Sequence, residues 1–165
     1  MNIQKSLAFL EKYIPSIANL FKRWFVEYLV PMNRSLGIKI KSIDASETVL
    51  SLKRKRKNLN YGGTVHGAAI MALAETAHGV TVLWKFPPVN HLMVSKKSNL
   101  TFLKKARGNL EVRFHLNTEK EKYIEKQLSE NGVCEVELTS AVADKSGDIV
   151  AELFAAYHIK RRNNN

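Results

Sequence analysis

Residues 60–85 of the chain, NYGGTVHGAAIMALAETAHGVTVLWK, contain the segment around which we expect the rest of the fold to be built. From Gly67 to Leu83 the residues are apolar on nearly every side of a helical projection, and a helix without a polar face is a buried helix. Pro87 and Pro88 follow shortly afterwards, and proline cannot continue a helix. The segment therefore predicts one long helix that other elements cover on all sides.

On both sides of this helix the hydrophobic residues alternate with polar ones, a period of two that is typical of strands. We expect one further, charged helix at residues 119–131, which Gly132 caps. We also expect six strands, at residues 38–41, 49–53, 92–103, 110–117, 133–143 and 149–159. Asp44–Ser46 and Asp144–Gly147 are the expected hairpin turns. The pattern predicts an α+β domain whose curved antiparallel sheet surrounds the apolar helix and leaves an open side for a second subunit.

The apolar helix contains one carboxylate, Glu75, which is also the only acidic residue between positions 61 and 108. Burying an ionised carboxylate is unfavourable unless a partner compensates it. Two interpretations stay open: a structural glutamate bonded to His78, one turn further on, or a general base or nucleophile. Glu75 and His78 also have the spacing found in di-iron bundles, but no second motif of this kind follows. We therefore expect neither a metal nor another cofactor.

The loop that precedes the helix is rich in glycine and opens directly onto the first helical turn. Gly62 and Gly63 permit a tight loop, and the free N–H groups at the start of a helix can hold an anion or a developing oxyanion. Gly67 lets a substrate approach the backbone closely. The loop and Glu75 together indicate a catalytic site more strongly than either does alone.

Three parts of the chain together carry a family resemblance. They are Asn60-x-x-Gly63-Thr64-x-His66-Gly67 followed by Leu73-Ala74-Glu75, the strand Ser95–Phe102 followed by Ala106-x-Gly108, and the hairpin from Glu135 to Ala151. They resemble the hot-dog fold acyl-CoA thioesterases of the phenylacetate-pathway type, over roughly residues 36–160. The charged insert at 119–131 is similar to that of a poorly characterised subgroup of hot-dog proteins.

The resemblance implies a role for five residues in thioester hydrolysis. Asn60 would help to place the thioester or the attacking water, and the Gly67 N–H would polarise the thioester carbonyl. His66 would support the loop or contact the substrate. Glu75, from the other subunit of a dimer, would act as base or nucleophile, and Ser95 matches a position that orients the water in some members. The family's usual second glycine after the histidine is Ala68 here.

The spacing of these residues agrees with a site shared between two chains. Nine residues separate His66 from Glu75, which is about 900° of helix and places them on opposite faces. A loop and a carboxylate from one chain cannot easily meet, so two chains would share each site. Around it we expect six substrate-binding residues: Gly63, Thr64, Lys96, Lys97, Arg54 and Arg56.

The formal charge of +11 comes almost entirely from two stretches of the sequence. Residues 36–60 hold seven basic and two acidic side chains, and residues 96–108 hold five basic and none acidic. The run Lys53–Lys57 has no aromatic residues among its charges for stacking on bases, so nucleic acid is not the expected partner. The phosphates of coenzyme A, an acidic carrier protein or plain solvation of a strand end remain as explanations.

The first thirty residues predict an amphipathic helical segment that Pro15 interrupts. We divide the chain into a helical extension at 1–34, a domain at 35–162 and a disordered tail at 163–165. The extension would cover the domain or, through Trp24 and Phe25, contact a membrane surface or a second subunit. No uninterrupted apolar run reaches the roughly 18 residues that span a bilayer, and from the N-terminal residues we expect no signal peptide. With the single Cys134, this predicts a cytoplasmic protein.

The sequence thus predicts a homodimeric or homotetrameric hydrolase acting on acyl-CoA or a similar acyl carrier. Water would attack a carbonyl held at the start of the apolar helix, and Glu75 would manage the proton or form a transient anhydride. The alternative is a non-catalytic hot-dog module that binds acyl groups or a partner. A third interpretation is a basic membrane-surface protein that uses residues 1–30. The acyl chain itself is not predicted.

Overall fold

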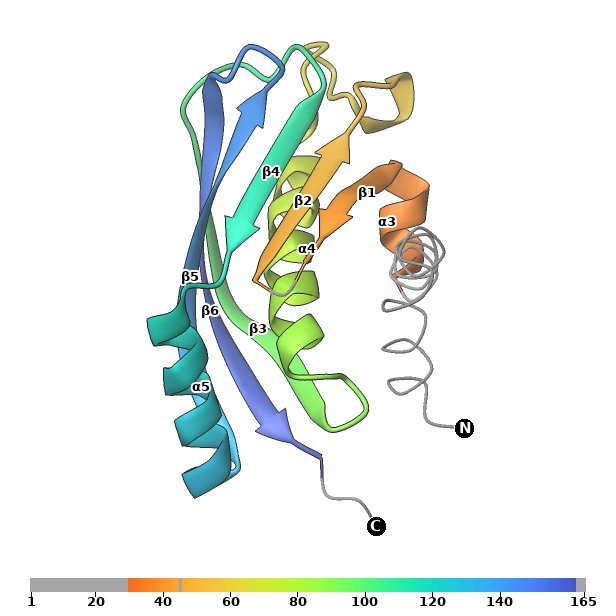
Figure 1. The fold of residues 1–165 in the computed structure, drawn as a ribbon. Helices are drawn as coiled ribbons and strands as arrows, with labels where there is room; N and C mark the ends of the chain where they lie inside the picture. Colours follow the sequence, from red (N-terminus) through yellow and green to blue (C-terminus); the bar gives the residue numbers. More distant parts are fainter. Residues whose placement is uncertain (1–29, 45, 163–165) are drawn as a thin grey trace, which may run out of the picture.

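The computed structural model describes residues 30–44 and 46–162, and it contains a six-stranded sheet around one long helix (Figure 1). Its elements are α3 Pro31–Leu36, β1 Ile38–Ile43, β2 Glu47–Leu52, a 3-10 turn at Arg56–Asn58, α4 Gly67–Lys85, β3 His91–Phe102, β4 Leu110–His115, α5 Thr118–Asn131, β5 Val133–Asp144 and β6 Ile149–Arg161. The predicted strands and both predicted helices after residue 36 are confirmed. The helical segment expected within residues 1–30 and the tail at 163–165 lie outside the described residues.

The sheet is antiparallel throughout and has the strand order β1-β2-β4-β5-β6-β3. It curves around α4, which lies along its concave face (Figure 1). Asp44 Oδ1 closes the β1–β2 turn by accepting hydrogen bonds from the Ser46 and Glu47 N–H groups, and Gly147 takes a positive φ of 85° in the β5–β6 turn. The predicted architecture, a curved sheet around one apolar helix, is therefore confirmed.

The core forms where the apolar side of α4 meets the concave face of the sheet. Leu73 of α4 has no exposed surface, and neither do Leu50 of β2 and Leu138 of β5. Ten of the nineteen residues of α4 are buried, and some of these are polar. This extensive burial explains why the sequence shows no polar face over this stretch. The other residues of α4 include Glu75, and also Thr76, which contacts α3, and Lys85, which pairs with Glu121 of α5.

We expect Leu73→Ala to lower the free energy of unfolding by about 2–5 kcal/mol, because it removes buried methyl groups and leaves a cavity. Urea denaturation followed by circular dichroism measures the difference. Leu103→Ala is the matched control, since that leucine is 51% exposed and its truncation should change the stability by less than about 1 kcal/mol. Equal losses for the two variants would contradict this assignment of the core.

The short helix α3 begins within the helical extension predicted at 1–34, and both of its ends carry a sequence signal. Pro31 occupies the first helical turn, and Gly37 ends the helix with a left-handed φ of 79°. The buried Asn33 accepts a hydrogen bond from Thr76 Oγ1 of α4 at 3.0 Å. This contact ties the start of the described chain to the central helix, so α3 belongs structurally to the domain core.

The charged helix α5 connects β4 to β5, two neighbouring strands of the sheet. β4 and β5 pair only at Leu110–Val112 with Val142–Asp144, and then they diverge (Figure 1). α5 fills the space between them by burying Ile124 and Leu128 against the sheet. Asn117 caps its first turn, and Gly132 ends it in the left-handed conformation that the sequence predicts. Lys120 Nζ donates to the Glu137 carbonyl of β5, which satisfies part of the unpaired strand edge.

α4 is also the one helix among the described residues that is long and apolar enough to cross a membrane by length and composition. Its mean hydropathy over an 18-residue window is 1.2, although polar residues interrupt the apolar run. Half of that window is buried inside the protein, and β2, β4, β5, β6 and β3 all contact the helix. A core helix meets these criteria as readily as a membrane span, and the contacts of α4 are those of a core helix.

Candidate active site

Glu75 lies in the middle of α4 and is half-buried where the helix faces β3. Its Oε1 accepts a hydrogen bond from Ser98 Oγ at 2.5 Å, and Ser98 Oγ is 2.9 Å from Ser95 Oγ. Ser95 and Ser98 are three residues apart and would point to opposite faces of a regular strand. A register shift between Ser95 and Lys97 turns the strand, so that both hydroxyl groups come together. Ser95 is predicted from the sequence as a site residue and Ser98 is not, because a bulge is not visible in the alternation.

His78, the partner that one interpretation gave to Glu75, bonds elsewhere in the structure. Its side chain is completely buried, and Nδ1 is 3.0 Å from the Tyr157 hydroxyl of β6. The Phe114 ring lies 4.4 Å away, centroid to centroid. Burial lowers the pKa of His78 to about 4, so the ring is neutral at pH 7. Burial and, to a lesser degree, the negative charge of Glu75 raise the pKa of Tyr157.

The burial of His78 predicts a loss of stability in acid. Between the unfolded pKa of 6.5 and the folded pKa of about 4, the unfolded chain binds a proton that the folded chain does not. Stability therefore falls as the pH is lowered through this window, by about 3 kcal/mol in total. Urea denaturation at a series of pH values measures the slope. In His78→Asn this part of the slope should disappear, and a wild-type slope in that variant would contradict the assignment.

The loop before α4 is held together by Asn60. The Asn60 side chain donates to Thr64 Oγ1 at 2.8 Å and accepts from the Thr64 N–H at 3.2 Å. Gly63 sits at the turn with a φ of 74°, where a side chain would be strained. Asn60 therefore shapes the loop that leads to the helix, and its amide atoms are engaged within that loop.

The first turn of α4 presents backbone N–H groups beside an open face. His66 is the N-cap residue: its side chain is exposed, and its Nδ1 accepts a hydrogen bond from the Ala68 N–H at 3.1 Å. Within residues 30–44 and 46–162 the Gly67 N–H has no hydrogen-bond partner. A Cβ at Gly67 would lie 2.7 Å from the tip of the Phe102 ring, so glycine permits the close packing here. A free donor at a helix N-terminus is suited to an oxyanion.

Gly67 and Glu75 of one chain are too far apart to act on the same carbonyl group. Eight residues of α-helix separate them, which corresponds to about 12 Å along the helix axis. The nucleophilic water and the oxyanion donor must both lie about 3 Å from the carbonyl group that reacts. The described chain thus holds two half-sites, one at the start of α4 and one at its centre.

The basic residues named from the sequence fall into two separate groups. Arg54 donates to the Gly63 carbonyl at 2.9 Å, and the Val65 N–H donates to Ala106 in the β3–β4 loop at 2.9 Å. These bonds bring Arg54 and Arg56 together with Arg107 at the N-terminal end of α4. We call Arg54, Arg56, Lys105 and Arg107 the basic rim; all four side chains are exposed.

Lys96 lies away from the basic rim. Its Nζ contacts Glu135 Oε1 of β5 at 2.5 Å, and the hydrogen bond and charge of Lys96 lower the pKa of Glu135. His158 Nδ1 is 3.8 Å from the same carboxylate oxygen. Lys97, the next residue, is exposed on β3. The two basic stretches of the sequence therefore converge only through residues 53–57 and 104–107.

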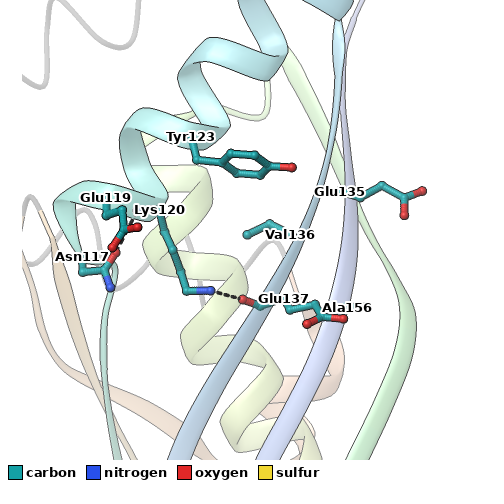
Figure 2. Close-up of a pocket in the computed structure, with 8 residues that line it drawn as sticks. All are labelled: Asn117, Glu119, Lys120, Tyr123, Glu135, Val136, Glu137 and Ala156. Atoms are coloured by element: carbon teal, nitrogen blue, oxygen red, sulfur yellow. Dashed lines mark hydrogen bonds between the residues drawn. The ribbon is translucent and has the colours of Figure 1, made fainter.

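A hollow of about 600 Å³ lies between α5 and β5 (Figure 2), and Glu75 is not among the residues that line it. Tyr123 and Lys120 point into it from α5, whereas Glu135 points to the other side of its strand. Its lining residues are Asn117, Glu119, Lys120, Tyr123, Glu135, Val136, Glu137 and Ala156. The hollow follows from the separation of β4 and β5, and none of the residues predicted for the site lines it. Cys134 of β5 is buried and packs in the core.

Several solved structures have a similar fold. A Pseudomonas aeruginosa protein of unknown function, described as a probable thioesterase, is 24% identical with a TM-score of 0.79, over 86% of this chain and 95% of that chain. A protein of unknown function from Chlorobaculum tepidum is 16% identical with a TM-score of 0.76, over 86% and 93% of the two chains. A mutant of a thioesterase enzyme from Staphylococcus aureus is 14% identical with a TM-score of 0.62, over 79% and 99%. At these identities the likeness concerns the fold.

The sequence comparisons give the family without an activity. No curated protein sequence matches the chain. The family described as a domain of unknown function, DUF4442, matches residues 18–159, which is most of the chain. The strand order, the central helix and the structural relatives confirm the predicted hot-dog fold. The chain therefore belongs to the DUF4442 family, a hot-dog fold family whose structural relatives include proteins named as thioesterases.

Proposed function

We propose that the protein is a thioesterase that hydrolyses acyl-CoA or a related acyl-carrier thioester. The observation that carries this proposal is Glu75, a half-buried carboxylate on the central helix whose Oε1 is fixed by Ser98. A fixed carboxylate with access to solvent can act as a general base toward water. The second support is the Gly67 N–H at the start of the same helix, which bonds to none of the described residues and is suited to the thioester oxygen.

The active form in this proposal is a dimer. Each complete site combines the Glu75 half-site of one chain with the Gly67 half-site of the other. β3 pairs with β6 on one side and with no strand among the described residues on the other. Leu92, Val94, Phe102 and Leu103 at this edge are between 45% and 57% exposed. A second copy seated along β3 would cover these side chains. It would also bring the start of its own α4 toward Glu75, since Glu75 faces β3.

The chemistry then needs no group beyond the side chains, the backbone and water. Glu75 accepts a proton from the attacking water as its oxygen bonds to the thioester carbon. The Gly67 N–H of the second subunit stabilises the negative charge on the carbonyl oxygen in the tetrahedral intermediate. When the carbon–sulfur bond breaks, Glu75 returns the proton to the departing thiolate. The products are a carboxylic acid and a free thiol, and the carboxylate of Glu75 is restored.

The basic rim supports a phosphate-bearing carrier as the leaving group. Arg54, Arg56, Lys105 and Arg107 lie at the end of α4 that offers the free Gly67 N–H. Cationic side chains beside a helix N-terminus favour phosphate groups. In this arrangement the nucleotide end of coenzyme A rests on the rim of one subunit, and the thioester points toward Glu75 of the other.

The experiment that tests the proposal is thiol release from a panel of acyl-CoA substrates. Purified protein is mixed with short, long and aromatic acyl-CoA, and the free thiol is detected with a chromogenic disulfide. At least one substrate should be hydrolysed with kcat above about 1 s⁻¹, at the low end of the range for enzymes. Absence of hydrolysis across all acyl classes would refute the proposal.

A further inference from the structure

A buried pair of polar side chains lies beside Glu75 and has no part in the chemistry described above. Glu75 and His78 are three residues apart on α4, so they project from neighbouring positions on one side of the helix. His78 bonds to Tyr157 of β6, and Tyr157 stands opposite Ser95 of β3 in the strand register. Ser95 in turn contacts Ser98, the hydrogen-bond partner of Glu75. Polar groups of α4, β3 and β6 therefore meet at one place.

The hydrogen bonds of His78 limit where its single proton can be. The ring is neutral at pH 7, and Nε2 is buried without a hydrogen-bond partner in the part of the chain that the structure describes. A proton on Nε2 would leave a buried N–H donor without an acceptor, which is rare in folded proteins. A proton on Nδ1 is used, because Nδ1 is 3.0 Å from the Tyr157 oxygen. His78 then donates to Tyr157, and the Tyr157 O–H is left to donate elsewhere.

Glu75 supplies the acceptor that such a hydroxyl needs. Its Oε1 accepts from Ser98, whereas its Oε2 accepts no hydrogen bond from residues 30–44 or 46–162. The negative charge of Glu75 raises the pKa of Tyr157 and is the second cause of that shift, after burial. An unused donor and an unused acceptor thus lie on the same concave surface. The structure has no direct hydrogen bond between them. One bridging water would satisfy both groups.

We propose that Tyr157 is a positioning residue for Glu75: its hydroxyl, oriented by His78, donates through one bridging water to the carboxylate and so holds the second oxygen in place for the attacking water. This inference rests on the proposed function, in which Glu75 is the general base. Ser98 and Tyr157 then fix the two carboxylate oxygens from two different strands. His78 acts through Tyr157 and touches neither the carboxylate nor the substrate.

The pH dependence of this arrangement involves few groups. Among the described residues, His78 of α4 contacts Tyr157 and Glu75 acts on it by its charge, whereas Cys134 of β5 is buried in the same core. β3 contributes the hydroxyl groups of Ser95 and Ser98. A donor to a carboxylate favours its charged form, so removing the Tyr157 hydroxyl moves the acid limb of the kcat profile to higher pH.

The first test reads the tautomer of His78 and needs no activity. Nitrogen-15 NMR of histidine-labelled wild-type protein at pH 7 distinguishes a protonated Nδ1 from a protonated Nε2. We expect the buried histidine, assigned with His78→Asn, to carry its proton on Nδ1. A proton on Nε2 would overturn the inference, because Tyr157 would then donate to His78 and have no proton for Glu75.

The second test compares Tyr157→Phe with wild type on the best substrate of the acyl-CoA panel. We expect kcat to fall about tenfold with KM within about twofold, and the acid limb of the pH profile to move upward. Tyr123→Phe removes the same hydroxyl from the exposed face of α5 and should leave both parameters unchanged. A purely structural role would lower the melting temperature and leave kcat and the pH profile of the folded protein unchanged, which would refute the inference.

Variants at His78 test the orienting step. His78→Leu should reproduce the kcat loss of Tyr157→Phe, and the double variant should lose no more than either single variant, because both remove one interaction. His78→Asn retains an N–H donor near the position of Nδ1 and should restore most of kcat. Additive losses would contradict the coupling. If wild type hydrolyses no substrate, the proposed function fails and this role falls with it; if wild type is active and Tyr157→Phe matches it, only the inference about Tyr157 fails.

Discussion

Glu75→Gln is expected to lower kcat for thioester hydrolysis by about 100-fold or more, because an amide cannot accept the proton of the attacking water. The substitution is nearly isosteric, and the amide oxygen can still accept the hydrogen bond that Ser98 donates to Oε1. We therefore expect the fold, the melting temperature and KM to change little. Thiol release measured under saturating acyl-CoA gives kcat directly.

The matched control for this variant is Glu119→Gln, which makes the same chemical change on the exposed surface of α5. It should retain wild-type kcat. Ser98→Ala is a graded comparison: it keeps the carboxylate but removes a donor that orients it, so we expect a loss of about tenfold. An active wild type in which Glu75→Gln retains more than a tenth of kcat would show that Glu75 is neither base nor nucleophile.

Gly67→Pro is expected to lower kcat by about 100-fold to 1,000-fold, the cost of removing one oxyanion donor. Proline has no N–H, and it is well tolerated at the first position of a helix, which Gly67 occupies. The preceding His66 has φ −64° and ψ 137°, a conformation that a following proline favours. The chain should therefore keep its fold while it loses the donor.

Gly67→Ala is the control that separates the missing N–H from the added side chain. Both variants place a Cβ 2.7 Å from the present position of the Phe102 ring tip, and that side chain is 57% exposed, so it can move aside. Alanine keeps the N–H and should lose no more than about tenfold in kcat. Equal losses in the alanine and proline variants would assign the effect to crowding and would refute the oxyanion role.

The same two variants test whether each site is shared between two chains. A heterodimer of Glu75→Gln and Gly67→Pro subunits would hold one site with both changes and one site with neither. Mixing the two inactive proteins under conditions of subunit exchange should then restore about a quarter of wild-type activity in a random population of dimers. Activity that stays at the level of the two variants, although heterodimers form, would place each site within one chain.

The sequence was sufficient to predict the elements and the architecture because one segment restricts the rest. A helix that is apolar on nearly all sides needs cover, and period-two segments before and after it can only provide that cover as a sheet. The turns at Asp44 and Gly147 and the cap at Gly132 agree with this local pattern. Glu75 and Gly67 could be singled out for the same reason, since a lone carboxylate and a glycine both stand out in an apolar run.

The contacts between segments distant in sequence were decided by the tertiary structure alone. Ser98 meets Glu75 because a bulge reverses one face of β3, and Tyr157 meets His78 because β6 lies under α4. The two basic stretches are separated for a similar reason. Lys96 of β3 pairs with Glu135 of β5, whereas Arg54 bonds to the Gly63 carbonyl in the loop before α4.

Sequence periodicity reports which face of its own element a residue occupies. It does not indicate which strand lies next to that element, or where a bulge shifts the register. The chain by itself therefore determined that a curved sheet surrounds one helix with a single carboxylate. Only the packing of that helix against β3 and β6 decided that Ser98 bonds to the carboxylate and that Tyr157 bonds to His78, because the partners of these two bonds are 23 and 79 positions apart.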